Sequence, residues 1–225
     1  MKIKSVPCKA SNYGGARETD NIRYLVIHYT AGRNDTAENN GIYFSRNSVG
    51  ASAHYFVDEN EVVQSVPDNM IAWHCGANKY YHANCRNGNS LGVEICTKQG
   101  KDGIYYFDTN AMDRAAVLSW YLMEKYQIPL DHVVRHYDVT HKNCPAPMVG
   151  DGEALWKLFK ERIMEVPDRI FEDVPSDSWY ANSVKYCVEN GLMNGVGEDR
   201  FEPDRPVTRA ELATVLFRIT NKRGT

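Results

Sequence analysis

Residues 24–28 read Tyr-Leu-Val-Ile-His, and residues 91–96 read Leu-Gly-Val-Glu-Ile-Cys. Short apolar runs of this length are typical of buried strands. His28 closes the first run, and Glu94 interrupts the second, where a carboxylate is costly to bury unless it is paired or functional. Because rigid scaffolds display reactive groups at strand ends, these runs predict a buried sheet that carries a site.

The same patterns predict further elements on both sides of these runs. Strands are expected at residues 53–57, 62–66 and 132–136, and helices at 37–45, 111–126 and 153–164. The 111–126 helix is the clearest, because its apolar residues recur every three or four positions and Pro129 blocks its extension. Residues 1–165 therefore predict one α/β unit.

The pattern changes around residues 166–168, and residues 171–219 predict a second, smaller unit. Its first helix spans about 181–190 and is stopped by Gly191. Its second helix begins at Thr208, which forms a Thr-x-x-Glu capping box with Glu211. A unit this small has a thin core and often needs a neighbour. The sequence thus predicts two domains, residues 1–165 and 166–225.

Composition argues against several classes of protein. The 225 residues carry a formal net charge of −3 with both signs interspersed, so a nucleic-acid partner is not expected. No apolar run is long enough for a transmembrane helix. Residues 1–15 are basic but lack an apolar stretch, so we expect synthesis in a cytoplasm without a signal peptide.

The cysteines leave two interpretations open. In a protein without an export signal, reduced thiols or metal ligands are favoured over disulfides. Cys75 and Cys85 lie in a loop-like stretch and offer the alternative, a disulfide formed outside the cell. The six cysteines are Cys8, Cys75, Cys85, Cys96, Cys144 and Cys187.

His28, His136 and Cys144 form the candidate metal site. His136 ends the last predicted strand, and Cys144 follows it by eight residues. Two imidazoles and one thiolate suit zinc and leave a fourth position for water, whose pKa zinc lowers to about 7. The plain alternative is a structural histidine at each strand end and a small buried cysteine.

Glu94 and Lys142 strengthen the metal interpretation. A general base and a cation beside a zinc-bound water are what amide hydrolysis requires. The alternatives are a solvent-facing edge strand for Glu94 and an ordinary exposed loop residue for Lys142.

Five segments together resemble one known family. These segments are YLVIHYTAG (24–32), SAHYFVD (52–58), AWHCG (72–76), NSLGVEIC (89–96) and RHYDVTHKNCP (135–145). They look like the type-2 N-acetylmuramoyl-L-alanine amidases, a family that includes phage endolysins and peptidoglycan-recognition proteins. The resemblance covers roughly residues 15–160 and implies a mixed β-sheet flanked by helices, with one zinc ion in a shallow groove.

The resemblance also implies roles for individual residues. His28, His136 and Cys144 fall on the family's zinc ligands, Glu94 on its general base and Lys142 on its oxyanion-stabilising lysine. The implied reaction hydrolyses the lactyl amide between muramic acid and L-alanine in peptidoglycan. Trp73 and His74 lie in a segment that resembles the substrate-facing loop; a partly buried core position is the alternative for the tryptophan. Some relatives carry a tyrosine where this chain has Ala53, which leaves the base function to Glu94.

Residues 171–219 resemble one S-layer homology repeat. The resemblance implies binding to a secondary cell-wall polymer, with Arg209 on the binding motif; an ion pair within its own helix is the alternative. Such repeats usually occur in threes, whereas one is visible here. We therefore expect self-association through this repeat, with weak binding by a single repeat, or packing on the first domain, as alternatives.

Four interpretations of the whole chain compete with a phage or prophage endolysin that acts at the wall after release from the cytoplasm. A bacterial autolysin shares the chemistry. A non-catalytic recognition protein would lack the need for Cys144, Glu94 and Lys142. A cytosolic amidase that recycles wall fragments would not need a wall-binding repeat. A structural zinc protein would use four protein ligands, and three are found.

Overall fold

The computed structural model describes residues 2–166, 171–175, 178–197 and 199–221. The chain divides into two compact units, Met1–Met164 and Glu165–Thr225. The predicted change of pattern at Pro167 and Asp168 lies outside the described residues.

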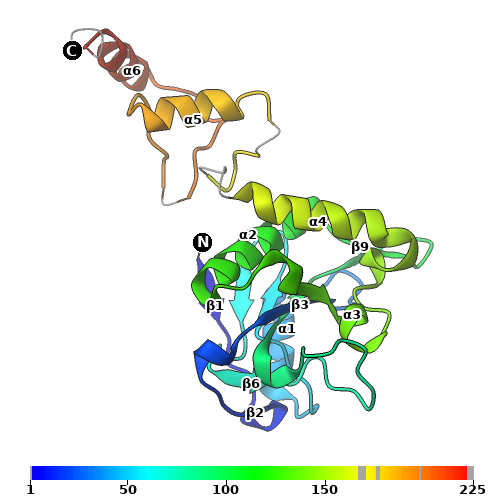
Figure 1. The fold of residues 1–225 in the computed structure, drawn as a ribbon. Helices are drawn as coiled ribbons and strands as arrows, with labels where there is room; N and C mark the ends of the chain where they lie inside the picture. The colour runs from blue at the N-terminus through cyan, green and yellow to red at the C-terminus, as the bar shows by residue number, and fades with distance from the viewer. Residues whose placement is uncertain (1, 167–170, 176–177, 198, 222–225) are drawn as a thin grey trace. The chain divides into compact units, whose positions relative to one another are not determined.

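Among its described residues, the first unit contains ten strands and four α-helices, with short 3-10 helices between them. Figure 1 labels the four α-helices and several of the strands. The strands are β1 (Ile3–Ser5), β2 (Tyr13–Ala16), β3 (Tyr24–Tyr29), β4 (Tyr55–Val57), β5 (Val62–Gln64), β6 (Met70–Ala72), β7 (Ser90–Ile95), β8 (Lys98–Gln99), β9 (Tyr105–Tyr106) and β10 (Val133–Arg135). The helices are α1 (Ala37–Arg46), α2 (Thr109–Tyr126), α3 (His136–Thr140) and α4 (Glu153–Glu165).

A six-stranded sheet forms the centre of this unit, in the order β1-β5-β4-β7-β3-β10. Only the β4–β5 pair is antiparallel, so the sheet is mixed. The predicted fold class, a mixed sheet flanked by helices, is therefore confirmed. Two small two-stranded sheets, β2-β6 and β8-β9, lie beside it.

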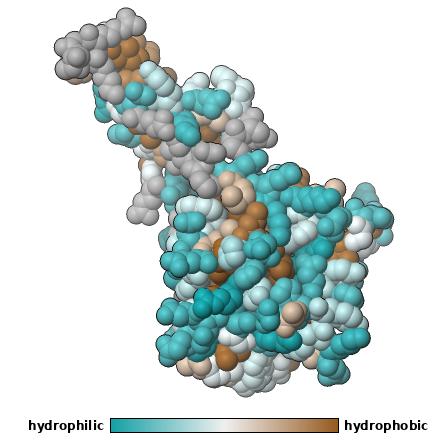
Figure 2. Space-filling view, viewed as in Figure 1, coloured by the Kyte–Doolittle hydropathy of each residue, from teal (hydrophilic) through white to brown (hydrophobic). Residues whose placement is uncertain are grey.

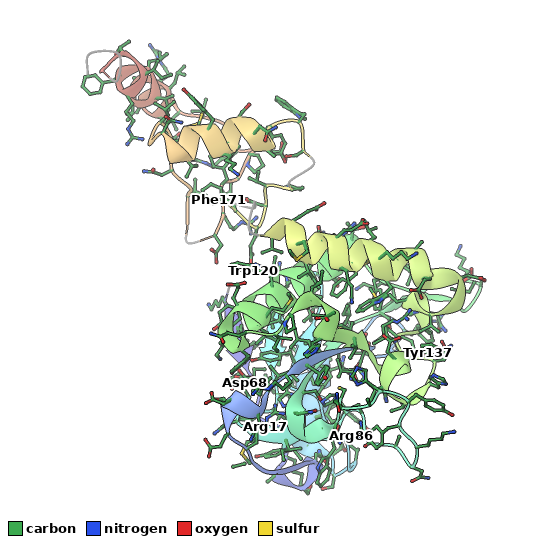
Figure 3. All side chains as sticks on the ribbon, viewed as in Figure 1. Arg17, Asp68, Arg86, Trp120, Tyr137 and Phe171 are labelled. Atoms are coloured by element: carbon green, nitrogen blue, oxygen red, sulfur yellow. The ribbon has the colours of Figure 1, made fainter. Side chains whose placement is uncertain are left out.

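Helices cover both faces of the sheet because strand side chains alternate. Phe56 stacks on Phe44 of α1, with ring centroids 5.3 Å apart. The adjacent Tyr55 points to the other face, where its hydroxyl donates to Asp68, 2.5 Å away. Tyr126 and Lys125 of α2 donate to the same carboxylate at 2.5 and 3.0 Å, so Asp68 fastens α2 to the sheet (Figure 3 labels Asp68).

The candidate site lies at the carboxyl ends of parallel strands. His28 is the fifth residue of β3 and pairs in register with Glu94, the fifth residue of β7. Glu94 in turn pairs with Phe56 of β4. Residues paired in this way share a face, so His28 and Glu94 lie on the α1 side. Carboxyl ends of parallel strands are the usual place for ligands in α/β folds.

Several predicted boundaries need correction. The strand predicted at 132–136 ends at Arg135, and His136 begins α3 instead of closing the strand. The strands predicted at 53–57 and 62–66 are reduced to Tyr55–Val57 and Val62–Gln64. The edge-strand alternative for Glu94 is wrong, because β7 lies between β4 and β3.

The second unit has two described helices, α5 (Ala181–Glu189) and α6 (Arg209–Asn221). Gly191, with φ of +61°, follows α5 as the predicted stop. The predicted capping box starts α6: Glu211 donates its backbone N–H to Thr208 Oγ1, and the Thr208 N–H donates to the Glu211 carboxylate. The small core contains Phe171, Val174 and Val184.

Among the described residues, no helix has the length and apolar character needed to span a bilayer.

Candidate metal centre

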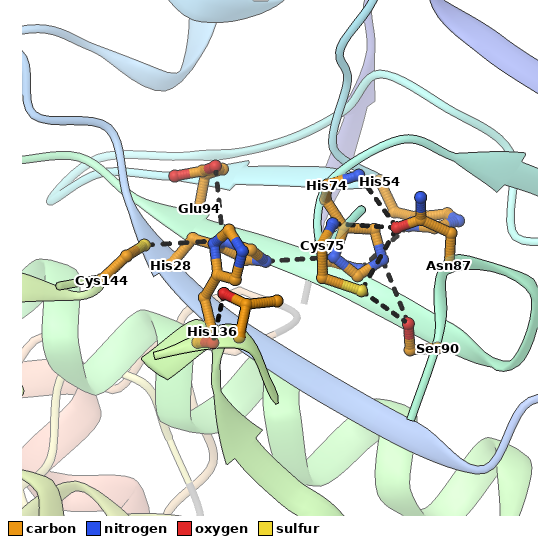
Figure 4. Close-up of polar contacts among 11 residues, drawn as sticks. His28, His54, His74, Cys75, Asn87, Ser90, Glu94, His136 and Cys144 are labelled. Atoms are coloured by element: carbon orange, nitrogen blue, oxygen red, sulfur yellow. Dashed lines mark hydrogen bonds and ion pairs between the residues drawn. The ribbon is translucent and has the colours of Figure 1, made fainter. Parts of the chain in front are cut away.

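Three buried side chains meet at the ends of β3 and β10. The candidate ligand atoms of His28, His136 and Cys144 all lie within 4.8 Å of one another (Figure 4). Cys144 Sγ is 3.6 Å from His28 Nδ1, and the two imidazole centroids are 4.6 Å apart. The three residues predicted as metal ligands are thus brought together, although Cys144 is 116 residues from His28 in sequence.

Short local structures bring His136 and Cys144 to β3. His136 follows β10, which is hydrogen-bonded to β3 with Arg135 opposite Ile27. The five-residue helix α3 ends at Thr140, and the next residue, His141, has a left-handed φ of 58° that turns the chain back. The Tyr137 N–H then donates to the Cys144 carbonyl at 2.7 Å, which fixes the thiol beside His28.

The donor set fits a metal ion. Burial lowers the pKa of His28 well below its usual value, and burial with the nearby Lys142 lowers the pKa of His136 to about 4. Both rings are therefore neutral near pH 7, the form that binds metal. Nδ1 of His136 is buried without a hydrogen-bond partner, a costly state that a metal ion would relieve.

Cys144 needs a cation nearby to ionise. Burial and the neighbouring Glu94 raise the pKa of the Cys144 thiol to about 12. A divalent ion among the three side chains would reverse this preference, because a coordinating thiol is deprotonated. Imidazole and thiolate are ligand types that bind zinc, and three protein ligands leave a fourth position open.

Glu94 stands next to this cluster. Its Oε1 is 3.9 Å from His28 Nδ1, and its buried Oε2 has no hydrogen-bond partner. Its side chain is 20% exposed. Burial raises the pKa of Glu94 to about 8, while the positive charge of Lys142 opposes the rise. A carboxyl tuned in this way exchanges a proton near neutral pH.

A groove of about 520 Å³ opens beside the cluster. His136 and Lys142 line it from the side of α3, and Trp73 lines it from the loop after β6. Trp73 is 38% exposed, so its ring is available to a ligand. No carboxylate is among the described lining residues, which are Gly50, Ala51, Trp73, His74, Gly76, Ala77, Asn87, His136, Thr140, His141 and Lys142.

His74 also lines the groove, but both of its ring nitrogens face protein atoms. Its Nδ1 is 3.1 Å from His28 Nε2, and its Nε2 is 3.1 Å from Ser90 Oγ. The sequence argument missed this contact with a candidate ligand. A signal was present in Gly92, because an isolated glycine within a strand often marks a close approach of another group.

Cys75 and Cys85 form no disulfide in this structure. Cys75 and Cys85 are both fully buried free cysteines, and Cys75 Sγ donates to Asn87 Oδ1 at 3.2 Å. In the second unit, Arg209 begins α6 and is exposed.

The fold and the buried His-His-Cys cluster define an α/β protein with a candidate metal centre at parallel strand ends. The chain belongs to the N-acetylmuramoyl-L-alanine amidase family, whose model matches residues 18–147. The S-layer homology domain model matches residues 170–213. The resemblances predicted from the sequence are thereby confirmed for both segments.

Individual proteins are similar either to the amidase segment or to the S-layer homology segment of this chain. The amidase BlyA of Bacillus subtilis (strain 168) is 37% identical over 155 residues, which cover 63% of this chain and 41% of BlyA. The chain thus spans about two fifths of the length of that relative. A mutant endolysin from Bacillus subtilis has a TM-score of 0.59 at 27% identity and covers 72% of this chain and 99% of its own. The S-layer protein sap of Bacillus anthracis is 43% identical over 53 residues, 24% of this chain and 6% of sap.

Proposed function

We propose that this protein is a zinc-dependent N-acetylmuramoyl-L-alanine amidase that hydrolyses the lactyl amide between muramic acid and L-alanine in peptidoglycan. The observation that carries the proposal is the buried cluster of His28, His136 and Cys144 with Glu94 beside it, in a chain of this family. In this proposal the three residues hold zinc. Zinc, when bound, supplies a Lewis acid that polarises a carbonyl and acidifies water.

Glu94 acts as the general base and then the general acid. Its carboxylate takes a proton from the attacking water, and the resulting acid delivers that proton to the leaving amine of L-alanine. The pKa near 8 and the position 3.9 Å from His28 support this role. Ala53 stands where some relatives have a tyrosine, so no second base is assigned at that position.

Lys142 stabilises negative charge on the substrate carbonyl oxygen. It lines the groove, and its positive charge acts on Glu94 as well. A preorganised cation aimed at developing charge is worth about 100- to 1000-fold in rate. Trp73 and His74 form part of the groove wall that contacts the glycan or the stem peptide.

The C-terminal unit provides attachment to the wall. Arg209 is proposed to contact an anionic secondary cell-wall polymer, and the match to the S-layer homology model supports this role. Self-association through the unit is part of the same proposal. Leu212, Leu216 and Phe217 of α6 are at least half exposed, as expected for a helix that is buried in an assembly.

The proposal also includes a biological role for the enzyme. We favour a phage or prophage endolysin that is made in the cytoplasm and reaches the wall after release, because an endolysin is among the similar structures. A bacterial autolysin is the alternative. Expression in a Gram-positive cytoplasm distinguishes them: an endolysin lyses cells only after the membrane is permeabilised, whereas an autolysin lyses them without that step.

The chemistry is tested by digestion of purified Gram-positive peptidoglycan with end-group analysis. The proposal expects new L-alanine amino termini that disappear with a zinc chelator and return with added zinc. New reducing sugar ends would mean that a different bond is cut. Binding to the wall without new ends would instead identify a recognition protein.

The ligand assignment has its own test. Cys144→Ser replaces a thiolate with a much poorer hydroxyl ligand, so both zinc content and activity should fall. Cys187→Ser in the second unit is the matched control and should retain both. Full zinc content in Cys144→Ser would exclude this cysteine as a ligand.

A further inference from the structure

We propose that His74, held by Ser90, is a positioning residue for the metal centre: it fixes the ring proton of His28 on Nε2, so that Nδ1 presents a lone pair to the metal. This inference rests on the zinc site proposed above. It assigns His74 a role in addition to lining the groove. The contacts that carry it are drawn as dashed lines in Figure 4.

The direction of the hydrogen bonds starts at a backbone carbonyl. Ser90 Oγ lies 2.7 Å from the carbonyl oxygen of Arg86, which can only accept. The single hydroxyl hydrogen of Ser90 is therefore donated to Arg86. Towards His74 Nε2, 3.1 Å away, the serine oxygen is left as an acceptor. His74 Nε2 must therefore be protonated and donate the hydrogen bond to Ser90 Oγ.

The protonation of His74 in turn determines which nitrogen of His28 carries a proton. A neutral imidazole protonated on Nε2 has a lone pair on Nδ1. Nδ1 of His74 accepts from Nε2 of His28 at 3.1 Å, so the His28 proton lies on Nε2. The bare nitrogen of His28 is then Nδ1, the atom 3.6 Å from Cys144 Sγ. A ligand histidine commonly donates its second N–H to a protein acceptor in this way.

The protein builds a place for the His74 ring. A Cβ added at Gly92 would lie 2.6 Å from Cγ and 2.9 Å from Nδ1 of His74, so the ring fits only because β7 has a glycine there. The backbone N–H of His74 donates to Asn87 Oδ1 at 3.2 Å. His54 holds Gly92 from the same region, since Gly92 N–H donates to His54 Nδ1 at 2.9 Å. The imidazole is therefore held in place before any ligand enters the groove.

The experiment measures zinc affinity by competition with a chromophoric chelator in the full chain, together with the His28 protonation state. His74→Ala removes the acceptor, so zinc affinity should fall about 10- to 100-fold. His74→Asn places an amide oxygen near the position of Nδ1 and should restore affinity to within a few-fold of wild type. His132→Asn is the matched control, because that ring stacks on Tyr24 and bonds to the Arg23 carbonyl.

A second measurement needs no variant. Two-bond 1H–15N correlation spectra of the zinc-loaded wild type identify which nitrogen of His28 carries a proton. The proposal expects the proton on Nε2 and the metal on Nδ1.

The outcomes separate the two proposals. A wild-type protein that binds no zinc overturns both the zinc site and this inference. Zinc binding with the proton of His28 on Nδ1 overturns only the role of His74. Unchanged zinc affinity in His74→Ala also overturns that role, and a change in KM alone would leave His74 as a substrate contact.

Discussion

The two units of this chain bury their apolar residues to different extents. In the first unit, the strands and helices enclose large side chains completely, and Phe159 of α4 is 0% exposed. In the second unit, α6 exposes side chains of the same kind, and Phe217 is 68% exposed. Figure 2 shows hydrophobic surface, in brown, on the C-terminal unit.

This difference separates two kinds of function. A metal centre with a held imidazole requires strands that do not move, and a closed core supplies them. A helix with exposed apolar side chains is typical of an interaction surface, which becomes buried when a partner binds. The predictions that follow test whether chemistry and attachment divide in the same way.

Metal removal should have the largest effect and should act on one unit alone. Dialysis against a zinc chelator is expected to reduce amide hydrolysis by at least about 1000-fold, because the Lewis acid contributes several kcal/mol. Added zinc should restore the rate. Co-sedimentation with purified walls should be unchanged, since the second unit contains none of the three ligands. Loss of wall binding together with activity would show that the units are not independent.

Replacing the base should have the next largest effect. Glu94→Gln keeps the shape of the side chain but cannot take a proton, so kcat should fall about 100- to 10,000-fold. Zinc content should be retained, because Glu94 is not one of the three ligands. Glu61→Gln is the matched control, since Glu61 pairs with Lys4 at 3.6 Å. A Glu94→Gln enzyme with wild-type kcat would move the base function to another group.

Part of the fold and part of the candidate site could be predicted from the sequence. The strands at 24–29 and 90–95 were predictable because apolar runs bounded by polar residues have few other structures available. The grouping of His28, His136 and Cys144 was predicted from their residue types and positions and was strengthened by the resemblance. The largely buried position of Glu94 in an inner strand agrees with the argument that such a carboxylate is paired or functional.

Other features could not be predicted from the sequence because tertiary contacts determine them. Strand β1 has three residues, two of them exposed, and exists through parallel pairing with β5, 57 residues or more away in sequence. His136 continues a β-like run, yet the capping of α3 by Asp138 turns the chain into a helix at that residue. The contact of His74 with His28 joins residues 46 apart in sequence, and Gly92 indicates a close approach to β7 without identifying the group that approaches.

A pair of matched phenylalanines tests the comparison through stability. Phe159→Ala should destabilise the first unit by about 3–5 kcal/mol, because it opens a cavity in a closed core. Phe217→Ala should change the stability of the second unit of a monomer by less than about 0.5 kcal/mol. Peptide-resolved hydrogen exchange of the full chain in a urea series measures both without assuming a single transition.

Protein concentration sharpens this test. If copies of the chain cover α6, protection of α6 should rise with concentration in the wild type and not in Phe217→Ala. Light scattering on the same samples then reports the oligomer. Concentration-independent protection and a monomeric mass would contradict self-association.

The smallest effect concerns the start of α6 and its dependence on pH. Glu211 accepts the Thr208 N–H at 2.8 Å and an Arg205 N–H at 2.5 Å, and these contacts lower its pKa from 4.5 to about 2. Because the folded-state pKa is below the unfolded one, the contribution of Glu211 is full above pH 4.5 and is lost as the pH falls towards about 2. The difference in α6 amide protection between wild type and Glu211→Ala should therefore be constant from pH 7 to about 5 and shrink in acid.

Glu211 is exposed and the charges are screened, so the difference should also decrease in high salt. A difference that stays constant down to pH 2 would mean that the alanine acts through helix propensity and not through the lost carboxylate.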